Sequence, residues 1–500
     1  IDGIFAILRN ALTAPGDQQD AKSIASLRTA IKALRANNKK LTAEIATKFP
    51  SYTELIAPKP PTPESVRKSL APGEALISYY LTEKNAYVWA VPKTGPIAFA
   101  NAALGKEDIG EMVDDLREAL DPGVGELGKI PDFNVALSHK LYKSLLAPVR
   151  RGWKNAKSLL VVSHKSLSKI PLSVFVTKPS RLPKESGALF AKYKNIPWLA
   201  KTHTVTALPS VASLVSLRAR PAAAKTRRAF VGFGDPYFSV QQATAAKQTA
   251  SVQVAASMRG ALMRGGRVNL RSAPKSRGVG NSELAKLPRL PDTGEEVVSV
   301  AKALRADQKR DVFLGTRATE EAVKQANLSD YKVLHFATHG LIPLDLNGLT
   351  QPALALSSPN LTAGTREDGL LTMGEILTLK LDADWVVLSA CNTAAGEEGG
   401  EAFSGLGRAF FYAGTRAILL SNWPVETTSA RALTTDLFKR QADQKNLSRS
   451  QALQAAMVSL INGEGYIDPK TNKVVFSYAH PIFWAPFSLV GDGGGGRPGA

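Results

Sequence analysis

Short apolar runs that alternate with helix-patterned segments are the feature that most limits how this chain can fold. The runs are rich in Val, Leu, Ile and Phe, and most of them precede a segment with helical periodicity. Strands of this kind must be covered on both faces, which favours a mostly parallel α/β sheet flanked by helices. The main expected strands are 158–163, 202–207, 228–234, 332–337, 385–389, 417–421 and 487–490.

Composition and periodicity divide the chain into six segments. Apolar residues at helical spacing predict an N-terminal helical hairpin, either as a unit or as the end of a helical repeat array. A proline-rich linker, two halves of an α/β domain with an aperiodic, mobile basic insertion between them, and a flexible tail should follow. The expected boundaries, in that order, are 1–57, 58–69, 70–240, 241–288, 289–492 and 493–500, with the insertion at 241–288.

The content of cysteine and of long apolar runs excludes several classes of protein. A single cysteine among 500 residues permits neither an internal disulfide nor a thiolate-rich zinc site. No apolar run approaches the roughly 18 residues that span a bilayer, and no signal-peptide pattern is present, so we expect a soluble, cytoplasmic protein. Because the chain begins at Ile1 instead of Met, we expect its natural N-terminus to lie upstream.

Basic residues are concentrated in two stretches of the chain. Lys and Arg number 63 against 43 Asp and Glu, which gives a net charge of +20. Residues 133–184 contain no acid, and Asp235 is the only acid in residues 225–277. Such a basic face would attract nucleic acid or another anionic partner. Because no nucleic-acid motif accompanies the charge, solvated Lys and Arg surfaces are the simpler interpretation.

One histidine and the single cysteine directly follow two of the expected strands. His339 comes after the strand at 332–337, and Cys391 comes after the strand at 385–389. The carboxyl ends of parallel strands meet at one edge of a sheet, so both side chains are expected at that edge. A thiolate can attack a carbonyl while an imidazolium protonates the leaving amine. Gly340 has no side chain to keep its N–H away from a substrate.

A small buried hydrophobe is the usual role of a lone cysteine. Cys391 differs because it ends a strand, precedes a turn of small residues at 392–396, and is soon followed by an apolar helix. His335 is expected to be a hydrogen-bonded core residue, because a second histidine on a strand without a carboxylate is a weak ligand set. No metal site and no cofactor motif are predicted.

Several motifs, in a fixed order, resemble the CHAT domain family. They are Val-Leu-His-Phe-Ala-Thr-His-Gly at 333–340, Val-Leu-Ser-Ala-Cys-Asn-Thr-Ala at 387–394 and Ser-Asn-Trp-Pro-Val at 421–425. Phe-Gly-Asp-Pro at 233–236 and Trp-Ala-Pro-Phe at 484–487 add to the likeness, which extends from about residue 70 to residue 492. This family is grouped with caspases, separases and gingipains among the caspase-fold cysteine peptidases.

The resemblance implies a caspase-like core with a pseudo-catalytic half before the insertion and a catalytic half after it. Cys391 would be the nucleophile and His339 its partner, and the N–H groups of Gly340 and Cys391 would form the oxyanion hole. The strand end at Asn422 and Trp423 would flank the peptide groove. Family members commonly carry upstream helical repeats, and the resemblance implies that these gate the site as a protein activator would. It also implies a role in a bacterial defence or signalling pathway.

Three functions are compatible with these residues. The first is a cysteine endopeptidase that cleaves a protein substrate and is regulated by a partner. The second is a catalytically silent scaffold, and the third is a nucleic-acid-responsive sensor that uses the basic surface. For a peptidase, a basic P1 side chain would require a carboxylate in the groove, and the candidates are Asp368, Glu401 and Glu426.

Overall fold

The computed structural model comprises two compact units, Ile1–Pro60 and Pro61–Ala500. Its described residues are 12, 20–48, 60–123, 126–224, 226–253, 284–343, 345–346, 348–361, 367–389, 405–444, 446–468 and 471–494.

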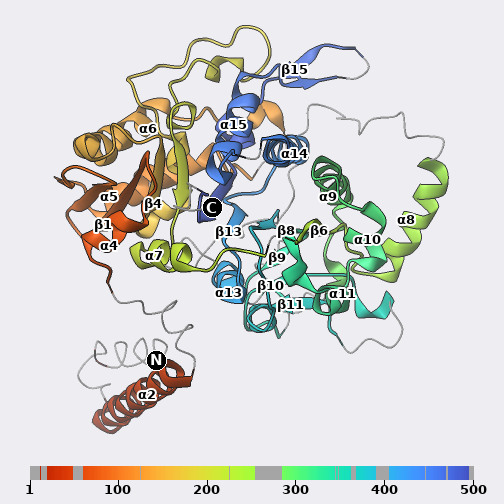
Figure 1. Cartoon of the computed structure of the whole chain (residues 1–500), viewed down its shortest axis with the longest axis horizontal. Helices are drawn as coiled ribbons and strands as arrows, with labels where there is room; N and C mark the ends of the chain where they lie inside the picture. Colours follow the sequence, from red (N-terminus) through yellow and green to blue (C-terminus); the bar gives the residue numbers. More distant parts are fainter. Residues whose placement is uncertain are drawn as a thin grey trace. The chain divides into compact units, whose positions relative to one another are not determined.

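The first unit contains one long described helix, α2 (Ala21–Lys48) (Figure 1). Asp20 caps its N-terminus by accepting the Lys22 N–H at 2.9 Å. Ile24 and Ile31 are buried on one side of the helix. This helix coincides with the second helix of the predicted hairpin, whereas nearly all of the first predicted helix lies outside the described residues.

The second unit begins with a helix where the sequence predicted an extended linker. Helix α4 (Pro63–Ser69) starts at a proline, and the Thr62 side chain accepts the Ser65 N–H at 3.2 Å. The difference has a simple cause: proline at the first helical position lacks only an N–H that would have no partner there, and its fixed φ suits a helix.

An eleven-stranded mixed sheet forms the centre of this unit and confirms the expected α/β class (Figure 1). Two parallel blocks, β1-β4-β5-β16 and β13-β12-β8-β6-β7, meet in one antiparallel pair, in which Ala417 of β13 lies opposite Gly491 of β16. An antiparallel hairpin extends the first block. In sheet order the strands are β3 (Ala98–Ala102), β2 (Ala86–Pro92), β1 (Glu74–Leu81), β4 (Ser158–Val162), β5 (Thr204–Ala207), β16 (Phe487–Gly491), β13 (Ala417–Ser421), β12 (Trp385–Leu388), β8 (Tyr331–Ala337), β6 (Arg228–Gly234) and β7 (Val312–Leu314).

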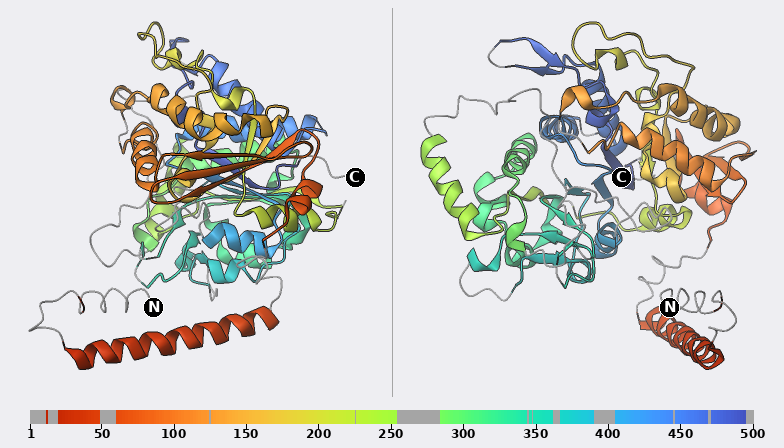
Figure 2. Two further views of the ribbon diagram at one scale, coloured as in Figure 1. Left: turned by 90° about the vertical axis from the view of Figure 1, so that its left-hand side faces the viewer. Right: turned by 180° about the vertical axis from the view of Figure 1, so that it is seen from behind.

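Helices cover both faces of the sheet (Figure 2). The main core joins one face to the apolar sides of α5 (Lys106–Glu118), α6 (Val135–Leu141), α9 (Pro291–Ala303), α14 (Thr427–Asp443) and α15 (Arg449–Asn462). A smaller cluster joins the other face to α4 and α7 (Val211–Ala219). The remaining helices are α8 (Val240–Gln253), α10 (Gln308–Asp311), α11 (Glu320–Gln325), α12 (Met373–Ile376), α13 (Gly405–Ala413) and α16 (Pro481–Trp484).

Two predicted segments differ in detail from the structure. Helix α8 occupies the first part of the segment predicted as an aperiodic insertion, because its Ala, Gln and Lys residues favour a helix without any apolar stripe. Most of the rest of that segment, residues 254–283, lies outside the described residues. The helix expected at 134–149 ends at Leu141 and continues as a π turn (Tyr142–Leu146) and a 3₁₀ segment (Ala147–Gly152) that contains Pro148.

Two small antiparallel sheets complete the unit. In one, β10 (Ala353–Ala355) pairs with β9 (Gly340–Leu341) and with β11 (Leu370–Thr372). The other is a hairpin of β14 (Tyr466–Ile467) and β15 (Val474–Phe476). Within the described ranges, no helix is both long and apolar enough to cross a bilayer.

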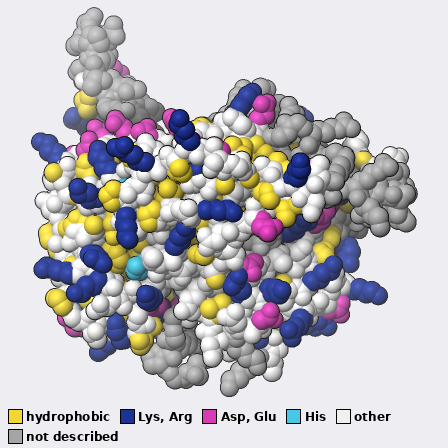
Figure 3. Space-filling view, turned by 90° about the horizontal axis from the view of Figure 1, so that it is seen from above, with side chains coloured by type: hydrophobic (Ala, Val, Ile, Leu, Met, Phe, Trp, Pro, Cys, Tyr) yellow, Lys and Arg dark blue, Asp and Glu magenta, His cyan; other side chains and the backbone are white. Residues whose placement is uncertain are grey.

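Figure 3 shows how charge is distributed over one face of the molecule. On the described part of this face, Lys and Arg side chains outnumber Asp and Glu, and they are scattered among apolar and neutral side chains. The dispersed arrangement fits solvated cations better than a single basic groove.

Candidate active site

The strands that lead to His339 and Cys391 are neighbours and run in the same direction. Leu388 of β12 lies beside Phe336 of β8, and the Ser389 N–H donates to the Phe336 carbonyl at 3.0 Å. Both strands therefore end at one edge of the sheet, as their spacing predicts. Cys391 itself lies outside the described residues, two positions after Ser389.

The His339 ring is fixed in one orientation. Its Nε2 lies 2.8 Å from the Pro288 carbonyl oxygen, and the Phe238 ring packs against it at 5.5 Å. A carbonyl can only accept, so Nε2 carries the hydrogen and Nδ1 keeps its lone pair in the neutral ring. Nδ1 is buried without a hydrogen-bond partner among the described residues. Burial lowers the pKa of His339 below its ordinary value, and the Pro288 hydrogen bond only partly opposes this, so the ring is neutral at pH 7.

The ring is also less accessible than its place at the strand end indicates. His339 is 0% exposed, whereas the sequence predicts only a location at the edge of the sheet. Phe238 and Pro288 cover the ring from segments far away in the chain, which a pattern of strand ends cannot reveal. Gly340 is partly exposed and begins β9, opposite Leu354 of β10.

An ion pair holds the backbone next to the Pro288 carbonyl. Arg289 donates from Nε and Nη2 to the two carboxylate oxygens of Asp235, at 2.9 and 2.6 Å. Its guanidinium also lies 4.8 Å from the centre of the Tyr237 ring. Asp235 has a left-handed φ of 46°, and its N–H donates to the Thr293 hydroxyl at 2.8 Å. Burial raises the pKa of Asp235, and Arg289 opposes that shift.

A buried carboxylate connects the two strands beneath the site. Glu296 of α9 is 0% exposed. Its Oε1 lies 3.3 Å from His335 Nε2 and 3.4 Å from the Thr434 hydroxyl, and its Oε2 accepts the Ser389 hydroxyl at 3.2 Å. The carboxylate thus accepts hydrogen bonds from the end of β12 and from α14 and lies beside β8. His335 is a core residue, as expected, but the expected hydrogen bond is absent: among the described residues neither ring nitrogen has a hydrogen-bond partner, and Glu296 is only its polar neighbour.

The strand end at Asn422 and Trp423 is bound to neighbouring segments, because the Asn422 N–H donates to the Pro486 carbonyl at 2.7 Å and its carbonyl accepts from Arg117 at 3.3 Å. Asn422 Nδ2 donates to the Pro486 carbonyl at 2.9 Å and to the Ser488 hydroxyl at 2.8 Å. Trp423 is 0% exposed, and its Nε1 donates to the Ile482 carbonyl at 3.2 Å. Both side chains are therefore held by the segment from α16 to β16.

The three acidic candidates for the groove have different surroundings. Glu426 is buried and caps α14, because its two oxygens accept the N–H groups of Thr428 and Ser429 at 3.0 and 2.7 Å. Asp368 is exposed and accepts the Leu370 N–H at 2.8 Å. Glu401 lies outside the described residues.

A second acidic group surrounds a lysine near α11. Lys324 Nζ lies 2.7 Å from Glu320, 2.5 Å from Glu367 and 2.8 Å from Glu375. Burial raises the pKa of Glu320 to about 8. For Glu375, hydrogen bonds from Lys324 and Thr372 outweigh burial and hold the pKa at about 2. The ammonium occupies the centre where a cation would sit, so we interpret the group as an ion-pair network that ties α11 to α12.

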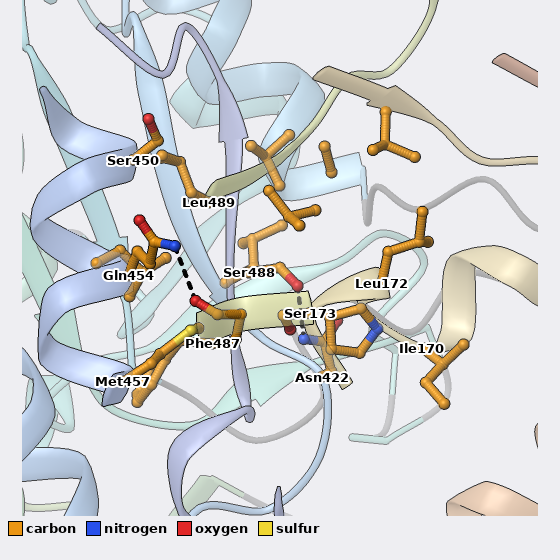
Figure 4. A pocket seen from close by; sticks show the side chains of 18 of the residues that line it. Ile170, Leu172, Ser173, Asn422, Ser450, Gln454, Met457, Phe487, Ser488 and Leu489 are labelled. Carbon is orange, nitrogen blue, oxygen red and sulfur yellow. Dashed lines mark hydrogen bonds between the residues drawn. The ribbon is translucent and has the colours of Figure 1, made fainter. Parts of the chain in front are cut away.

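A cavity of about 50 Å³ lies between α15 and the centre of the sheet (Figure 4). Its wall is largely apolar, with Leu172 and Met457 on opposite sides and Asn422 and Ser488 bonded together at one end. Gln454 on α15 donates to the Ala200 carbonyl at 2.8 Å. Of the predicted site residues that the structure describes, Asn422 alone lines this cavity.

Sequence reasoning missed Pro288, Arg289, Asp235 and Glu296. Asp235 carried a usable signal, because it is a polar residue at the carboxyl end of a buried strand. Glu296 carried another, because it is adjacent to Val297 on the apolar side of a helix. The role of Pro288 as the hydrogen-bond acceptor of His339 could not be predicted from the sequence, because it depends on a backbone carbonyl, which every residue has.

The sheet and this polar edge define an α/β protein whose candidate functional groups follow the carboxyl ends of parallel strands. The family model described as "CHAT domain" matches residues 135–492, and the chain belongs to that family.

Curated relatives share part of this domain. The chain is 26% identical over 230 residues to tetratricopeptide repeat protein 28 of Mus musculus, a match that covers 41% of this chain and 9% of the relative. The Homo sapiens protein of the same name is 26% identical over 229 residues, with coverage of 41% and 8%. The chain therefore spans less than a tenth of the length of these relatives.

Solved structures show more distant likenesses. The Arg-specific cysteine proteinase gingipain R is similar with a TM-score of 0.35 and 9% identity, over 78% of this chain and 75% of the other. The separase in the Saccharomyces cerevisiae separase–securin complex is similar with a TM-score of 0.41 and 11% identity, over 86% of this chain and 30% of the other.

Proposed function

We propose that this chain is a cysteine endopeptidase of the CHAT type, in which Cys391 and His339 form a catalytic dyad acting on a protein substrate. One observation carries the proposal. The neutral His339 ring is held through Nε2 by the Pro288 carbonyl, its Nδ1 has no hydrogen-bond partner among the described residues, and it follows the strand adjacent to the one that leads to Cys391.

In the proposed reaction, His339 Nδ1 removes the thiol proton and the sulfur of Cys391 attacks the scissile carbonyl carbon. The N–H groups of Gly340 and Cys391 stabilise the resulting oxyanion. The C–N bond then breaks as the imidazolium gives its proton to the departing amine, leaving a thioester. Water, activated by the same ring, hydrolyses the thioester and restores the thiol.

The substrate groove is proposed to run past the backbone of Asn422 and Trp423. Asp368 is the acid candidate that fits a basic P1 side chain best among the described residues, because it is exposed whereas Glu426 caps a helix. One extended segment lies between His339 and the loop at Asp368. In it, the Ala355 N–H donates to the His339 carbonyl on one side, and the Leu356 N–H donates to the Gly369 carbonyl on the other. That separation is about 10 Å at the usual strand spacing. Glu401 remains a candidate for the same role.

The complete burial of His339 favours a second feature of the proposal, namely a latent site that a partner opens. A substrate must displace Phe238 or the segment at Pro288 to reach the ring, because both cover it. We propose that a protein activator supplies this change, as upstream helical repeats would in related chains. A scaffold without catalysis is the alternative, and it predicts a Cys391 that never reacts faster than a free thiol.

Labelling with an electrophilic peptide tests the proposal. With an activator bound, the uncovered ring should be largely neutral above its ordinary pKa of about 6.5, and the labelling rate should be nearly flat between about pH 7 and 8. An unassisted thiol with a pKa of about 8.5 would instead react about tenfold more slowly for each pH unit of acidification. Mass spectrometry should place the label on Cys391. A free-thiol profile that persists with an activator bound would support the scaffold.

The Arg289–Asp235 pair gives a second test, because it holds the backbone beside Pro288. Asp235→Asn keeps a residue that tolerates left-handed backbone but removes the charge. We expect kcat to fall about fivefold with little change in KM, equivalent to one weakened hydrogen bond of about 1 kcal/mol. The acidic limb of the pH profile should move to lower pH, since the Pro288 carbonyl favours the protonated ring.

Arg305→Gln is the matched control for this test. It removes an exposed ion pair, 3.4 Å long, between Arg305 and Asp443, and it should leave both kcat and the pH profile unchanged. If Asp235→Asn lowers only the stability and leaves the pH profile in place, Asp235 has no positioning role.

A further inference from the structure

Five ring side chains lie together on one face of the hairpin end of the sheet. We call this surface the ring face, and it consists of Tyr80, Tyr87, Trp89, Phe99 and His164. Tyr80 of β1 lies opposite Tyr87 of β2, and Trp89 of β2 lies opposite Phe99 of β3. His164, just after β4, stacks on Tyr80 at 4.8 Å. The Trp89 and Phe99 rings are 5.3 Å apart. Tyr80 and Phe99 are 53% and 49% exposed.

Among the described residues, helices cover only part of this sheet face. The same face is covered at its other end by α4 and α7, which enclose Leu76 and Leu160 in a small apolar cluster. The opposite face, which carries Val88 and Ala98, is fully buried in the main core. Figure 2 (left) shows the hairpin strands at the front, with the orange helices α5 and α6 on one side of them. The ring face is thus a contiguous aromatic surface, which a folded protein seldom leaves without a function.

Cations lie at both ends of the ring face. Lys84 is exposed in the turn between β1 and β2, and Lys165 directly follows His164. At the other end, Lys93 Nζ lies 3.0 Å from a carbonyl of α4, which also carries the exposed Lys68. Glu83, which precedes Lys84 in the turn between β1 and β2, is paired with Lys106 at 2.8 Å. Between these cations, the seven residues of β2 span roughly 20 Å.

We propose that the ring face binds single-stranded nucleic acid. Bases would stack on Tyr80, Trp89 and Phe99, and phosphates would pair with the lysines at the two ends. Every base has a π face, so stacking on aromatic side chains tolerates any sequence, and an aromatic sheet face of this size accommodates two or three bases. Flanking lysines disfavour a protein partner, because lysine is depleted at protein–protein interfaces. The proposal does not depend on the reactivity of Cys391.

This surface is not the one that the sequence pointed to. The expected basic face came from residues 133–184 and 225–277, of which only His164 belongs to the ring face, with Lys165 next to it. The alternation of aromatic and small residues in β2 and β3 was the more useful pattern for finding this surface. Without the sheet register, however, it indicates only two amphipathic strands, not that their rings lie together.

Fluorescence anisotropy on the full chain tests the proposal, with labelled oligouridylate, oligothymidylate and a DNA duplex of the same length as probes. We expect both single strands to bind more tightly than the duplex. Tyr80→Ala and Phe99→Ala should each weaken binding by about tenfold or more, because a stacked base contributes about 1–3 kcal/mol and 1.36 kcal/mol is a factor of ten. Lys84→Ala should reduce the slope of log K against log salt by about 0.7.

Two control variants separate the ring face from general effects of charge and apolarity. Val475→Ala removes an equally exposed apolar side chain on β15, and Lys169→Ala removes an exposed cation of the acid-free stretch. Neither should change the affinity by more than about twofold, and all variants should keep the wild-type melting temperature.

Three results would overturn the proposal. They are no binding of single strands even at low salt, tighter binding of the duplex, and equal affinity of the wild type and both alanine variants. Sedimentation velocity adds a fourth: self-association that Phe99→Ala abolishes, without any nucleic-acid binding, would assign the ring face to a second copy of the chain.

Discussion

Replacing Cys391 with alanine is expected to lower the rate of substrate cleavage by at least about 10⁴-fold. The sulfur is the atom that attacks, and removing the nucleophile of a hydrolase costs several orders of magnitude even when the oxyanion site is intact. The melting temperature should stay within about 1 °C, because the change removes a single sulfur atom and introduces no polar or bulky group. Cleavage of a fluorogenic protein substrate with the activated full chain measures the rate.

His339→Gln provides the partner experiment. Its amide can still donate to the Pro288 carbonyl but cannot take a proton at neutral pH, so cleavage should fall to a similar level. The double variant should be no slower than either single variant, because the two side chains act as a unit. A Cys391→Ala chain that still cleaves, or a double variant whose effects multiply, would contradict the dyad.

Replacing Glu296 with alanine should cause the largest loss of stability, about 2–5 kcal/mol in the free energy of unfolding, because it truncates a buried side chain and removes a buried acceptor. The change removes the carboxylate that accepts from the Ser389 and Thr434 hydroxyls and that lies 3.3 Å from His335 Nε2. Chemical unfolding in urea measures the loss as a lower midpoint, provided that the slope of the transition is unchanged.

The neighbouring residue supplies a matched control for Glu296. Glu295 is on the same helix, but its side chain is 65% exposed and pairs with Arg431 at the surface. Glu295→Ala should cost less than about 1 kcal/mol, as exposed ion pairs usually do. Glu296→Gln should lie between the two, because an amide can still accept one hydroxyl. Equal losses for Glu295→Ala and Glu296→Ala would show that the buried bridge contributes nothing.

The central strands could be predicted from the sequence because each is a continuous apolar run. Strands β8, β12 and β13 are enclosed on both faces, so their composition alone identified them. The antiparallel pairing of β16 with β13 could not be predicted, because apolar runs carry no direction. Helix α4 was missed since its prolines were interpreted as breakers, although Pro63 begins the helix.

The candidate site was predictable in position but not in its environment. His339 was found because polar residues after parallel strands gather at one edge. Its burial was not, because Phe238 and Pro288 reach it only through the tertiary fold. The three acids were interpreted as equivalent, yet Glu426 caps a helix and Asp368 faces solvent. The role of a carboxylate depends on the N–H groups that surround it in the folded chain, and the sequence does not show these.

The single antiparallel pair at the centre of the sheet makes the two parallel blocks of strands run in opposite directions. Strands β1, β4 and β5 point one way, whereas β8, β12 and β13 point the other way. The loops after the two sets of strands therefore emerge at opposite rims. A ligand bound at the edge where β1, β4 and β5 end would not cover the edge that carries His339. One copy of this domain could therefore bind two ligands at the same time.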